Sequence, residues 1–427
     1  MILEFTVKNT LSIKDEQLIS FEAAESVHED DELHCIEYGG KKFLKLACIY
    51  GANASGKTNI AEAFAFYVHF FIKSFHFLQP TEKIHFFPFL FDSKTASEPG
   101  EFSIVFYAKD FDSENEIRYE YFIKLNKERV LEESLYYSPK GQRKLIFERK
   151  DVIKWGTCVT GAKKVIADLT RDNCSVVSAG AQAKHPIFLH IYDHFNERFK
   201  GMIDSSDNTL SGYVAKRMEE DEDFKKKVTQ LLAFSDVGNI TDITIKKQEL
   251  PEEFLKSIPE EVRNEFTKRR ETPVIRNVSL IHHYGNDIEL PLAMESAGTQ
   301  KIMELAAPLI DITQEPSLCL IDELESSLHQ ELLEMFIQLF LESSTDSQIL
   351  FTSHNQELLD SGFLRDDEIW FCNKDSNGGS KYNSIADYTG IRKETSRKKL
   401  YQADKFGALP NVDMNRLREL FCAKKNR

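Results

Sequence analysis

The eight residues from Gly51 to Thr58 combine glycines, a lysine and a hydroxyl at the spacing that binding of a polyphosphate requires. They read Gly-Ala-Asn-Ala-Ser-Gly-Lys-Thr, which fits the pattern Gly-x-x-x-x-Gly-Lys-[Ser/Thr]. In this pattern backbone N–H groups surround the β-phosphate, the lysine neutralises the β/γ oxygens and the hydroxyl can hold Mg²⁺. The sequence therefore predicts a nucleotide-binding loop with Thr58 as a ligand of Mg²⁺. The residues expected to contact the nucleotide are Gly51, Asn53, Ala54, Ser55, Gly56, Lys57, Thr58 and Asn59.

The segments on either side of this loop have the patterns that would position it. Residues 44–50, Leu-Lys-Leu-Ala-Cys-Ile-Tyr, form a mostly apolar run of strand length. Residues 59–75 predict a helix that is apolar nearly all round, which is typical of a helix in a core or under a partner. A helix that leaves the loop aims the positive end of its dipole at the phosphates.

A second candidate site lies at residues 318–323, where an apolar strand, Leu-Cys-Leu-Ile-Asp-Glu, ends in two acids. This is a Walker B pattern, in which Asp322 would hold Mg²⁺, directly or through water, and Glu323 would orient the attacking water. Two acids at the end of a buried strand are costly unless they serve a metal or a partner. An ordinary strand end is the alternative, but it would leave the phosphate loop without a companion.

Two further motifs flank these acids. Ser296 lies 26 residues before Asp322, in the run Glu-Ser-Ala-Gly-Thr-Gln that opens a predicted helix. His354 lies 31 residues after Glu323, at the end of an apolar strand, and could donate a hydrogen bond to a γ-phosphate. Ser296 and Gly298 would open a helix N-terminus, which is a site for an anion. Taken alone, the serine run could equally be an ordinary helix cap.

The order of these motifs resembles that of the ABC-type ATPases: phosphate loop, insertion, Ser-x-Gly-x-Gln signature, Asp-Glu strand, D-loop and switch histidine. Residues 325–329, Glu-Ser-Ser-Leu-His, stand where that family has its D-loop. The resemblance implies an ATPase that works as a homodimer, or a higher homo-oligomer, with ATP sandwiched between subunits. Ser296 and Gly298 would then bind the γ-phosphate of ATP held by the other subunit, and Glu323 and His354 would be catalytic.

Within this class, the chain resembles the OLD-like, RloA/AbiL-type ATPases of bacterial phage-defence operons. It rests on the opening motifs Phe-Thr-Val-Lys-Asn (5–9) and Leu-Ser-Ile-Lys (11–14), on the phosphate loop, and on the tail motifs Asp-Glu-Ile-Trp-Phe (367–371) and Phe-Gly-Ala-Leu-Pro (406–410). It implies an ATPase subunit that senses phage, through a phage protein or nucleic acid. This subunit would control a separately encoded effector, often a TOPRIM-like nuclease.

The chain departs from that family in two respects. OLD proteins proper carry a TOPRIM nuclease in the same chain, whereas only 73 residues follow His354 here, too few for that domain. No secure Q-loop glutamine stands between the first helix and the strands that follow it, and Gln79 is the only candidate.

Composition and charge exclude several classes of protein. A net charge of −15 argues against a surface that binds nucleic acid throughout, although it leaves room for a local basic groove. The 7 cysteines include no Cys-x-x-Cys pair, which favours reduced thiols in a cytoplasmic protein. We read no signal peptide and no run of 18 apolar residues, so we expect no membrane partner.

The expected fold class is α/β: an ABC-type P-loop ATPase head with an antiparallel β meander and a mostly helical insertion between the phosphate loop and the signature. Residues 1–149 would form the N-terminal half of the head and residues 286–427 the C-terminal half, with the insertion at 150–285. The pattern predicts a helical stretch over 190–234 and a charged helical excursion over 249–271. The predicted strands outside the two motif strands are 3–7, 17–22, 102–109, 117–125, 130–138, 143–149, 240–247 and 274–283.

Two other functions compete with the defence ATPase. A genome-maintenance ATPase of the RecF or SMC type would act directly on DNA, but SMC-type heads carry long heptad coiled coils, and residues 190–271 show no sustained heptads. A self-contained nuclease toxin is the third class, and the short tail and the missing nuclease pattern argue against it.

Weaker signals have simpler explanations. His185, His190 and His194 could hold a metal, but with no nearby cysteine or patterned acid we interpret them as ordinary helix histidines. Basic clusters at 140–144 and 392–399 could contact the phosphates of DNA or RNA, and solvated faces explain them more simply.

Overall fold

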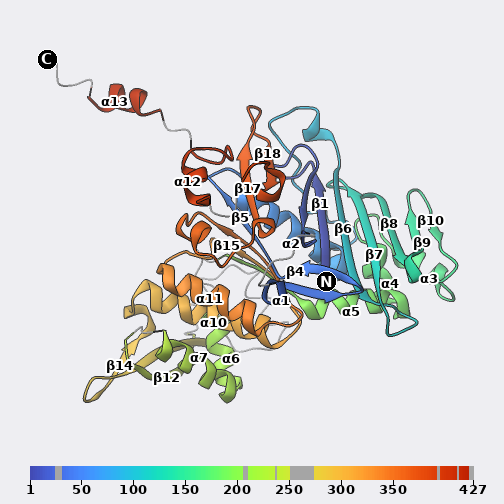
Figure 1. The fold of residues 1–427 in the computed structure, drawn as a ribbon. Coiled ribbons are helices and arrows are strands. Elements are labelled where there is room, and N and C mark those ends of the chain that lie inside the picture. The colour runs from blue at the N-terminus through green and yellow to red at the C-terminus, as the bar shows by residue number, and fades with distance from the viewer. Residues whose placement is uncertain are drawn as a thin grey trace. The chain divides into compact units, whose positions relative to one another are not determined.

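The structure, a computed structural model, describes residues 1–24, 31–204, 210–235, 238–250, 274–391, 395–410 and 413–422 (Figure 1). The chain forms two compact units, and each contains segments that are far apart in the sequence. The first consists of residues 1–203, 316–322 and 345–427, and the second of residues 204–315 and 323–344. The predicted three-part division at 149/150 and 285/286 stays a prediction.

A six-stranded sheet in the first unit carries the phosphate loop. Its strand order is β11-β15-β16-β5-β17-β18, in which β15, β16, β5 and β17 run parallel and β18 runs antiparallel to β17. Strands β5, β15 and β16 are buried along their whole length because both faces of the sheet are covered. The bounds are β5 (Leu46–Gly51), β11 (Phe199–Asp204), β15 (Leu318–Asp322), β16 (Gln348–Ser353), β17 (Ile369–Lys374) and β18 (Ser380–Ser384).

A seven-stranded antiparallel sheet is the second layer of this unit. Its order is β10-β9-β8-β7-β6-β1-β2, so that the predicted meander is confirmed and the N-terminal strand pairs with its first member. The bounds are β1 (Ile2–Lys8), β2 (Gln17–Ser20), β6 (Gly100–Lys109), β7 (Glu116–Leu125), β8 (Val130–Ser138), β9 (Lys144–Arg149) and β10 (Ile153–Trp155).

Helix α2 (Lys57–Phe77) begins at the phosphate loop and is buried in the core of this unit. On the side of the antiparallel sheet, the Phe64 ring stacks on Phe5 with ring centroids 4.4 Å apart, and the Tyr67 hydroxyl donates to the Tyr121 carbonyl at 2.7 Å. The same core includes Leu320 and Leu350 of the parallel sheet. The nearly all-round apolar character of this helix therefore reflects burial between two sheets, and its packing fixes the direction in which it leaves the loop.

Smaller elements complete the first unit. They are α1 (Asp31–His34), β3 (Cys35–Tyr38), β4 (Lys41–Leu44), α3 (Lys163–Leu169), α4 (Val176–Gln182), α5 (Pro186–Arg198), α12 (Arg397–Gln402) and α13 (Met414–Cys422). The stretch predicted to be helical over 190–234 is helical for most of its length, but strand β11, which the sequence did not predict, interrupts it. The backbone of Gly201 has a φ of 86°, outside the helical region, and β11 gains its hydrogen bonds from pairing at the edge of the six-stranded sheet. Such a tertiary interaction overrides local helix propensity.

The second unit combines helices with a three-stranded antiparallel sheet, ordered β12-β13-β14. Its core joins α6, α7, α10, β12 and β13, which confirms the two strands predicted here. The bounds are α6 (Leu210–Glu220), α7 (Glu222–Phe234), β12 (Ile240–Glu249), β13 (Val274–His283), β14 (Asp287–Pro291), α10 (Ala297–Gln314) and α11 (Gln330–Ser343). The predicted charged helical excursion over 249–271 lies outside the described residues, apart from residues 249 and 250.

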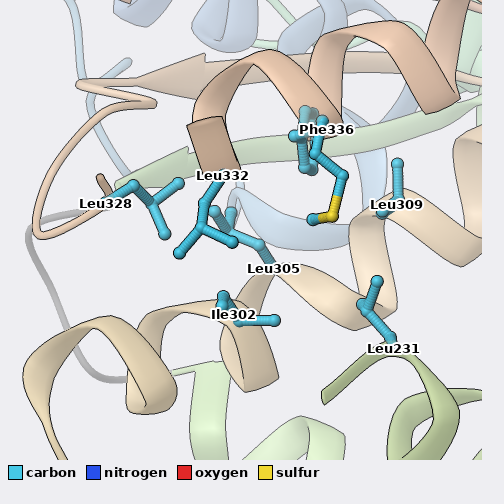
Figure 2. A pocket seen from close by; sticks show the side chains of 8 residues that line it. Leu231, Ile302, Leu305, Leu309, Leu328, Leu332 and Phe336 are labelled. Carbon is cyan, nitrogen blue, oxygen red and sulfur yellow. The ribbon is translucent and has the colours of Figure 1, made fainter. Parts of the chain in front are cut away.

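Helices α7, α10 and α11 meet at a small apolar pocket within the second unit (Figure 2). Its lining contains no charged side chain and consists of Leu231, Ile302, Leu305, Leu309, Leu328, Leu332, Met335 and Phe336. Among the described residues, no helix combines the length and the apolar character that a membrane span requires.

The position of α2 yields a test of packing. Replacing the fully buried Phe64 by alanine should lower the free energy of unfolding by about 3–5 kcal/mol, because it removes a ring from a close-packed core. Phe77, at the other end of the same helix, is 70% exposed, and Phe77→Ala should change the stability by no more than about 0.5 kcal/mol. Urea denaturation of both variants checks the difference, and equal losses would show that α2 is not packed as described.

Candidate functional site

Pairing of the parallel strands brings the sequence motifs of the first unit to one edge of the sheet. Strand β16 lies between β5 and β15, and its residues Ser353 and Phe351 align with Tyr50 of β5 and Ile321 of β15, respectively. The carboxyl ends of all three strands therefore lie together, which is where open α/β sheets bind ligands. The phosphate loop follows β5, Asp322 ends β15, and His354 follows β16 as an exposed residue.

The backbone of the loop requires its glycines. Gly56 caps the N-terminus of α2 with a φ of 111°, a conformation that side chains disfavour, and Ala54 has a φ of 63°. A Cβ atom on Gly51 would lie 2.4 Å from the carbonyl oxygen of Cys372 in the adjacent strand β17. The loop is thus tightly enclosed by its neighbours, while Asn53 and Ala54 at its tip are exposed.

Lys57 is buried against the loop that precedes it, with 6% of its surface exposed. Its ammonium group donates to the carbonyls of Gly51 at 2.9 Å and Ala52 at 3.2 Å. An ammonium has three protons, so these two hydrogen bonds leave one for a phosphate oxygen. The side chain is therefore held beside the loop, and its predicted contact with the β/γ oxygens stays a prediction.

Thr58 and Asp322 come together although they are 264 residues apart in the sequence. The Thr58 hydroxyl donates to Asp322 Oδ2 at 2.8 Å, and Thr352 Oγ1 of β16 donates to Asp322 Oδ1 at 2.5 Å. A hydroxyl and a carboxylate are ligands suited to Mg²⁺, which is usually held by one or two carboxylates together with substrate phosphates. In the described parts of the chain, no group of three or more His, Cys, Asp and Glu residues is placed to hold a metal by itself. These residues fit a Mg²⁺ ion that arrives with a nucleotide.

The remaining loop residues have different environments. Ser55 is buried, and its hydroxyl makes no hydrogen bond within the described residues. The Asn59 side chain donates to Ser12 Oγ at 2.6 Å, so it contacts the segment between β1 and β2. Asn59 thus orients the first turn of α2, and its predicted contact with the nucleotide stays a prediction.

Glu323 belongs to the second unit, because the chain passes from one unit to the other directly after Asp322. Its φ of 50° is in the left-handed region, which ends β15 and begins the turn that leads to α11. The D-loop residues 325–329 form this turn and the approach to α11. The catalytic roles predicted for Glu323 and His354 stay predictions.

Gln79 is too far from the loop to serve as the Q-loop glutamine. It follows the C-terminal end of α2, whose N-terminal end is at the phosphate loop. A helix of 21 residues is about 30 Å long, and Gln79 is exposed at its far end. The only sequence candidate for this Mg²⁺ contact is therefore excluded.

The signature residues open helix α10 in the second unit, as predicted. Ser296 is the N-cap, and its exposed side chain accepts a hydrogen bond from the Thr299 amide at 3.1 Å. Gly298 stands in the first turn, where an added Cβ atom would come no closer than 3.5 Å to its neighbours. The helix N-terminus thus has room for an anion, and the trans role of both residues stays a prediction.

A buried histidine–carboxylate pair supports this helix start. His282 of β13 contacts Glu295 Oε1 through Nε2 at 2.7 Å and the Gly238 carbonyl through Nδ1 at 2.5 Å. Burial lowers the pKa of His282, but hydrogen bonding to the Glu295 carboxylate and the Gly238 carbonyl outweighs burial, so that its pKa is raised. The residue directly before Ser296 is thereby tied to the three-stranded sheet.

The other histidines singled out in the sequence have protein partners. His185 and His190 contact the carbonyls of Thr160 and Lys109 at 2.9 and 2.8 Å. The ring of His194 stacks on Phe106, and burial holds its pKa well below the usual range. Of the basic clusters, Arg143 pairs with Glu120 and stacks over the ring of Tyr136. Residues 392–394 of the second cluster lie outside the described residues.

Three polar residues outside the predicted site lie at or beside the phosphate loop. They are Ser12, Ser380 and Tyr382, together with the thiol of Cys372, which lies 3.3 Å from the Ser55 carbonyl oxygen. Burial raises the pKa of Cys372 to about 11, so this thiol is protonated near neutral pH. Ser12 lies in the opening motif at 11–14, whereas Cys372, Ser380 and Tyr382 belong to no motif singled out in the sequence, and the order of strands in the sheet brings these three to the loop.

The loop, the helix that leaves it and the carboxylate beside Thr58, set in a mainly parallel sheet, define a P-loop nucleotide-binding protein of the α/β class. Residues 46–360 match the family described as AAA domain, putative AbiEii toxin, Type IV TA system, and the chain belongs to this family. No curated protein matches the chain.

Solved structures of SMC heads are similar to the chain. The SMC head domain from Thermotoga maritima has 15% sequence identity and a TM-score of 0.44, with 90% of this chain and 98% of that chain covered. An SMC head bound to the C-terminal winged-helix domain of ScpA has the same identity and TM-score and covers 90% and 97%. The SMC head domain with an extended coiled coil, bound to the C-terminal domain of ScpA derived from Pyrococcus furiosus, has 13% identity and a TM-score of 0.41, covering 95% and 98%.

The His282–Glu295 pair gives a pH-dependent prediction. Because the pKa of His282 is raised in the folded chain, its contribution to stability is full below the ordinary histidine pKa and is lost as the pH rises through the raised value. Glu295→Gln should lower the pKa of His282, measured by NMR titration of the imidazole protons. Asp287→Asn, which alters the partner of the neighbouring His283, is the control and should leave it unchanged. An unaltered His282 titration in Glu295→Gln would contradict the pairing.

Proposed function

We propose that the chain is an ATP-binding and ATP-hydrolysing subunit of a bacterial antiviral defence system, a dimeric switch that senses phage and controls a separate effector such as a nuclease. The observation that carries the ATPase part is the hydrogen bond of 2.8 Å between Thr58 and Asp322. It joins a phosphate loop to a carboxylate that ends a buried strand, which is the arrangement that binds nucleotide with Mg²⁺. The defence part is supported by the family, which is described as a putative AbiEii toxin of a Type IV TA system, and by the resemblance to OLD-like ATPases.

Binding would use the loop and the start of α2. The N–H groups of the loop and the N-terminus of α2 would surround the β-phosphate, and the Lys57 ammonium would donate to the β/γ oxygens. Thr58 and Asp322 would hold Mg²⁺, which when bound supplies charge neutralisation at the phosphate oxygens. These residues orient the triphosphate and leave the γ-phosphate at the carboxyl edge of the sheet.

Hydrolysis would use residues that follow the strands. The Glu323 carboxylate would accept a proton from the attacking water, whose oxygen forms the new bond to the γ-phosphorus while the bond to the bridging oxygen of ADP breaks. His354 would donate a hydrogen bond to a γ-phosphate oxygen. Ser296 and Gly298 of a second copy would close the site, since their helix N-terminus is exposed and suited to an anion.

Replacing Glu323 by glutamine tests its proposed role in accepting a proton from the attacking water. Glu323→Gln should keep ATP binding but hydrolyse ATP about 10²–10⁴-fold more slowly, because the water loses the carboxylate that accepts its proton. Steady-state phosphate release measures the rate, and Glu342→Gln, at an exposed position of α11, serves as the control. A Glu323→Gln rate within about threefold of the wild type would rule out this role.

Completion of the site by a second copy is tested by mixing two inactive variants. Lys57→Ala removes the phosphate-binding charge, and Ser296→Arg places bulk and charge at the signature, so each variant alone should lack ATPase activity. In a mixed dimer, one site carries both lesions and the other carries neither, because a twofold axis pairs each loop with the partner's signature. ATPase activity should therefore reappear on mixing. Mixed dimers seen by native mass measurement without any recovered activity would count against two independent trans sites.

A further inference from the structure

Two hydroxyl groups of strand β18 donate hydrogen bonds to the phosphate loop. Ser380 Oγ donates to the carbonyl of Ser55 and Tyr382 Oη to the carbonyl of Gly56, each at 2.6 Å. Both side chains are on the same face of β18, because residues two apart in a strand point the same way. Both are buried, and neither lies within residues 46–360, which match the family.

A third hydroxyl, on Ser12, extends this contact to the start of α2. Ser12 Oγ lies 2.7 Å from Ser380 Oγ and accepts from the Asn59 side-chain amide at 2.6 Å. A serine hydroxyl has a single proton. Since Ser380 gives its proton to the Ser55 carbonyl, Ser12 must give its own to Ser380. The hydrogen bonds therefore run in one direction, from Asn59 through Ser12 and Ser380 to Ser55.

The hydroxyl pair also fills the space beside Gly56. A Cβ atom at this position would lie 2.1 Å from Ser380 Oγ and 2.6 Å from Ser12 Oγ. The backbone amide of Ser380 donates to the Ser12 carbonyl at 2.7 Å, which keeps the two segments together independently of their side chains. Two hydroxyls thus lie directly against Gly56 and leave no room for a side chain there.

A hydrogen bond that fixes the direction of a carbonyl also fixes the direction of the N–H group in the same peptide bond. In a trans peptide, the C=O of one residue and the N–H of the next point in opposite directions. Holding the Ser55 and Gly56 carbonyls toward β18 therefore turns the N–H groups of Gly56 and Lys57 away from β18. The Gly56 carbonyl also accepts from the Asn59 amide at 3.0 Å, within the first turn of α2.

We propose that Ser12, Ser380 and Tyr382 are positioning residues that aim the Gly56 and Lys57 amides at the phosphates of the bound nucleotide. The inference rests on the proposed function in that it takes the loop to bind nucleotide. It places a determinant of nucleotide affinity between β1 and β2 and in β18, outside residues 46–360, which match the family. Ser12 acts only through Ser380, whereas Tyr382 acts on a different peptide group.

The test compares Ser380→Ala, Ser12→Ala and Tyr382→Phe with two matched controls. Tyr401→Phe removes a buried hydroxyl that donates to the Ala408 carbonyl at 3.2 Å, and Ser384→Ala removes a buried serine hydroxyl of the same strand that does not touch the loop. Two quantities are measured: ATP affinity in Mg²⁺, and hydrogen exchange of the peptide that covers residues 51–59 in the nucleotide-free chain.

Ser380→Ala and Tyr382→Phe should each weaken ATP binding roughly 3- to 10-fold and speed exchange in this peptide, while the controls should do neither. The Ser12→Ala/Ser380→Ala double variant should bind ATP about as well as Ser380→Ala alone, because both changes break one chain of hydrogen bonds. Should Ser380→Ala fail to fold, Ser12→Ala tests the same chain from its other end.

Three outcomes separate this inference from the proposed function. In the first outcome, the wild type binds ATP, and Ser380→Ala and Tyr382→Phe change neither the ATP affinity nor the hydrogen exchange of the loop. This result would overturn the inference and leave the proposed function intact. In the second outcome, the fold-losses of ATP affinity in Ser12→Ala and Ser380→Ala multiply in the double variant. This result would show that the two hydroxyls act independently and would overturn the directional chain of hydrogen bonds. A wild type that binds no ATP would refute the proposed function, and exchange in the 51–59 peptide would then still decide whether the hydroxyls hold the loop.

Discussion

The candidate site depends on how the buried carboxylate of Asp322 is satisfied. A buried charge is costly unless it is hydrogen-bonded or paired, and Asp322, with 6% of its surface exposed, accepts from the hydroxyls of Thr58 and Thr352. These two bonds connect α2 with strands β15 and β16 at the carboxyl edge of the sheet. Under the proposed function, the same carboxylate would also be a ligand of the Mg²⁺ ion that arrives with the nucleotide.

Sequence patterns predicted the parts of this protein whose signals are local. The phosphate loop has a fixed spacing, the meander strands alternate in burial as in β7, and Ser296 has the chemistry of a helix cap. Sequence patterns did not predict those features that depend on contacts between segments far apart in the chain. Strand β11 forms because a sheet edge offers pairing, and Gln79 is excluded only once the length of α2 is known. Ser380 gains its importance from the strand order β5-β17-β18, which no local pattern encodes.

The hydroxyl donors Ser380 and Tyr382 show that segments outside the family match also contact the phosphate loop. The phosphate loop and the strand that ends in Asp322 lie within the family match at 46–360. The loop's carbonyls, however, are held by Ser380 and Tyr382 from beyond that match. A chain that kept residues 46–360 and lost the tail would retain the phosphate loop without the two hydroxyls that hold its carbonyls. Residues 46–360 alone are therefore an incomplete description of the proposed site.

The central claim is that the loop at 51–58 and Asp322 bind ATP as its magnesium complex. Equilibrium titration of the purified chain with a fluorescent ATP analogue, in Mg²⁺ and again in excess EDTA, tests it most directly, with Lys57→Ala as the matched variant. The account predicts saturable binding of one nucleotide per chain that weakens without Mg²⁺ and is lost in Lys57→Ala. Absence of binding by the wild type, or equal affinity in the wild type and Lys57→Ala, would contradict it.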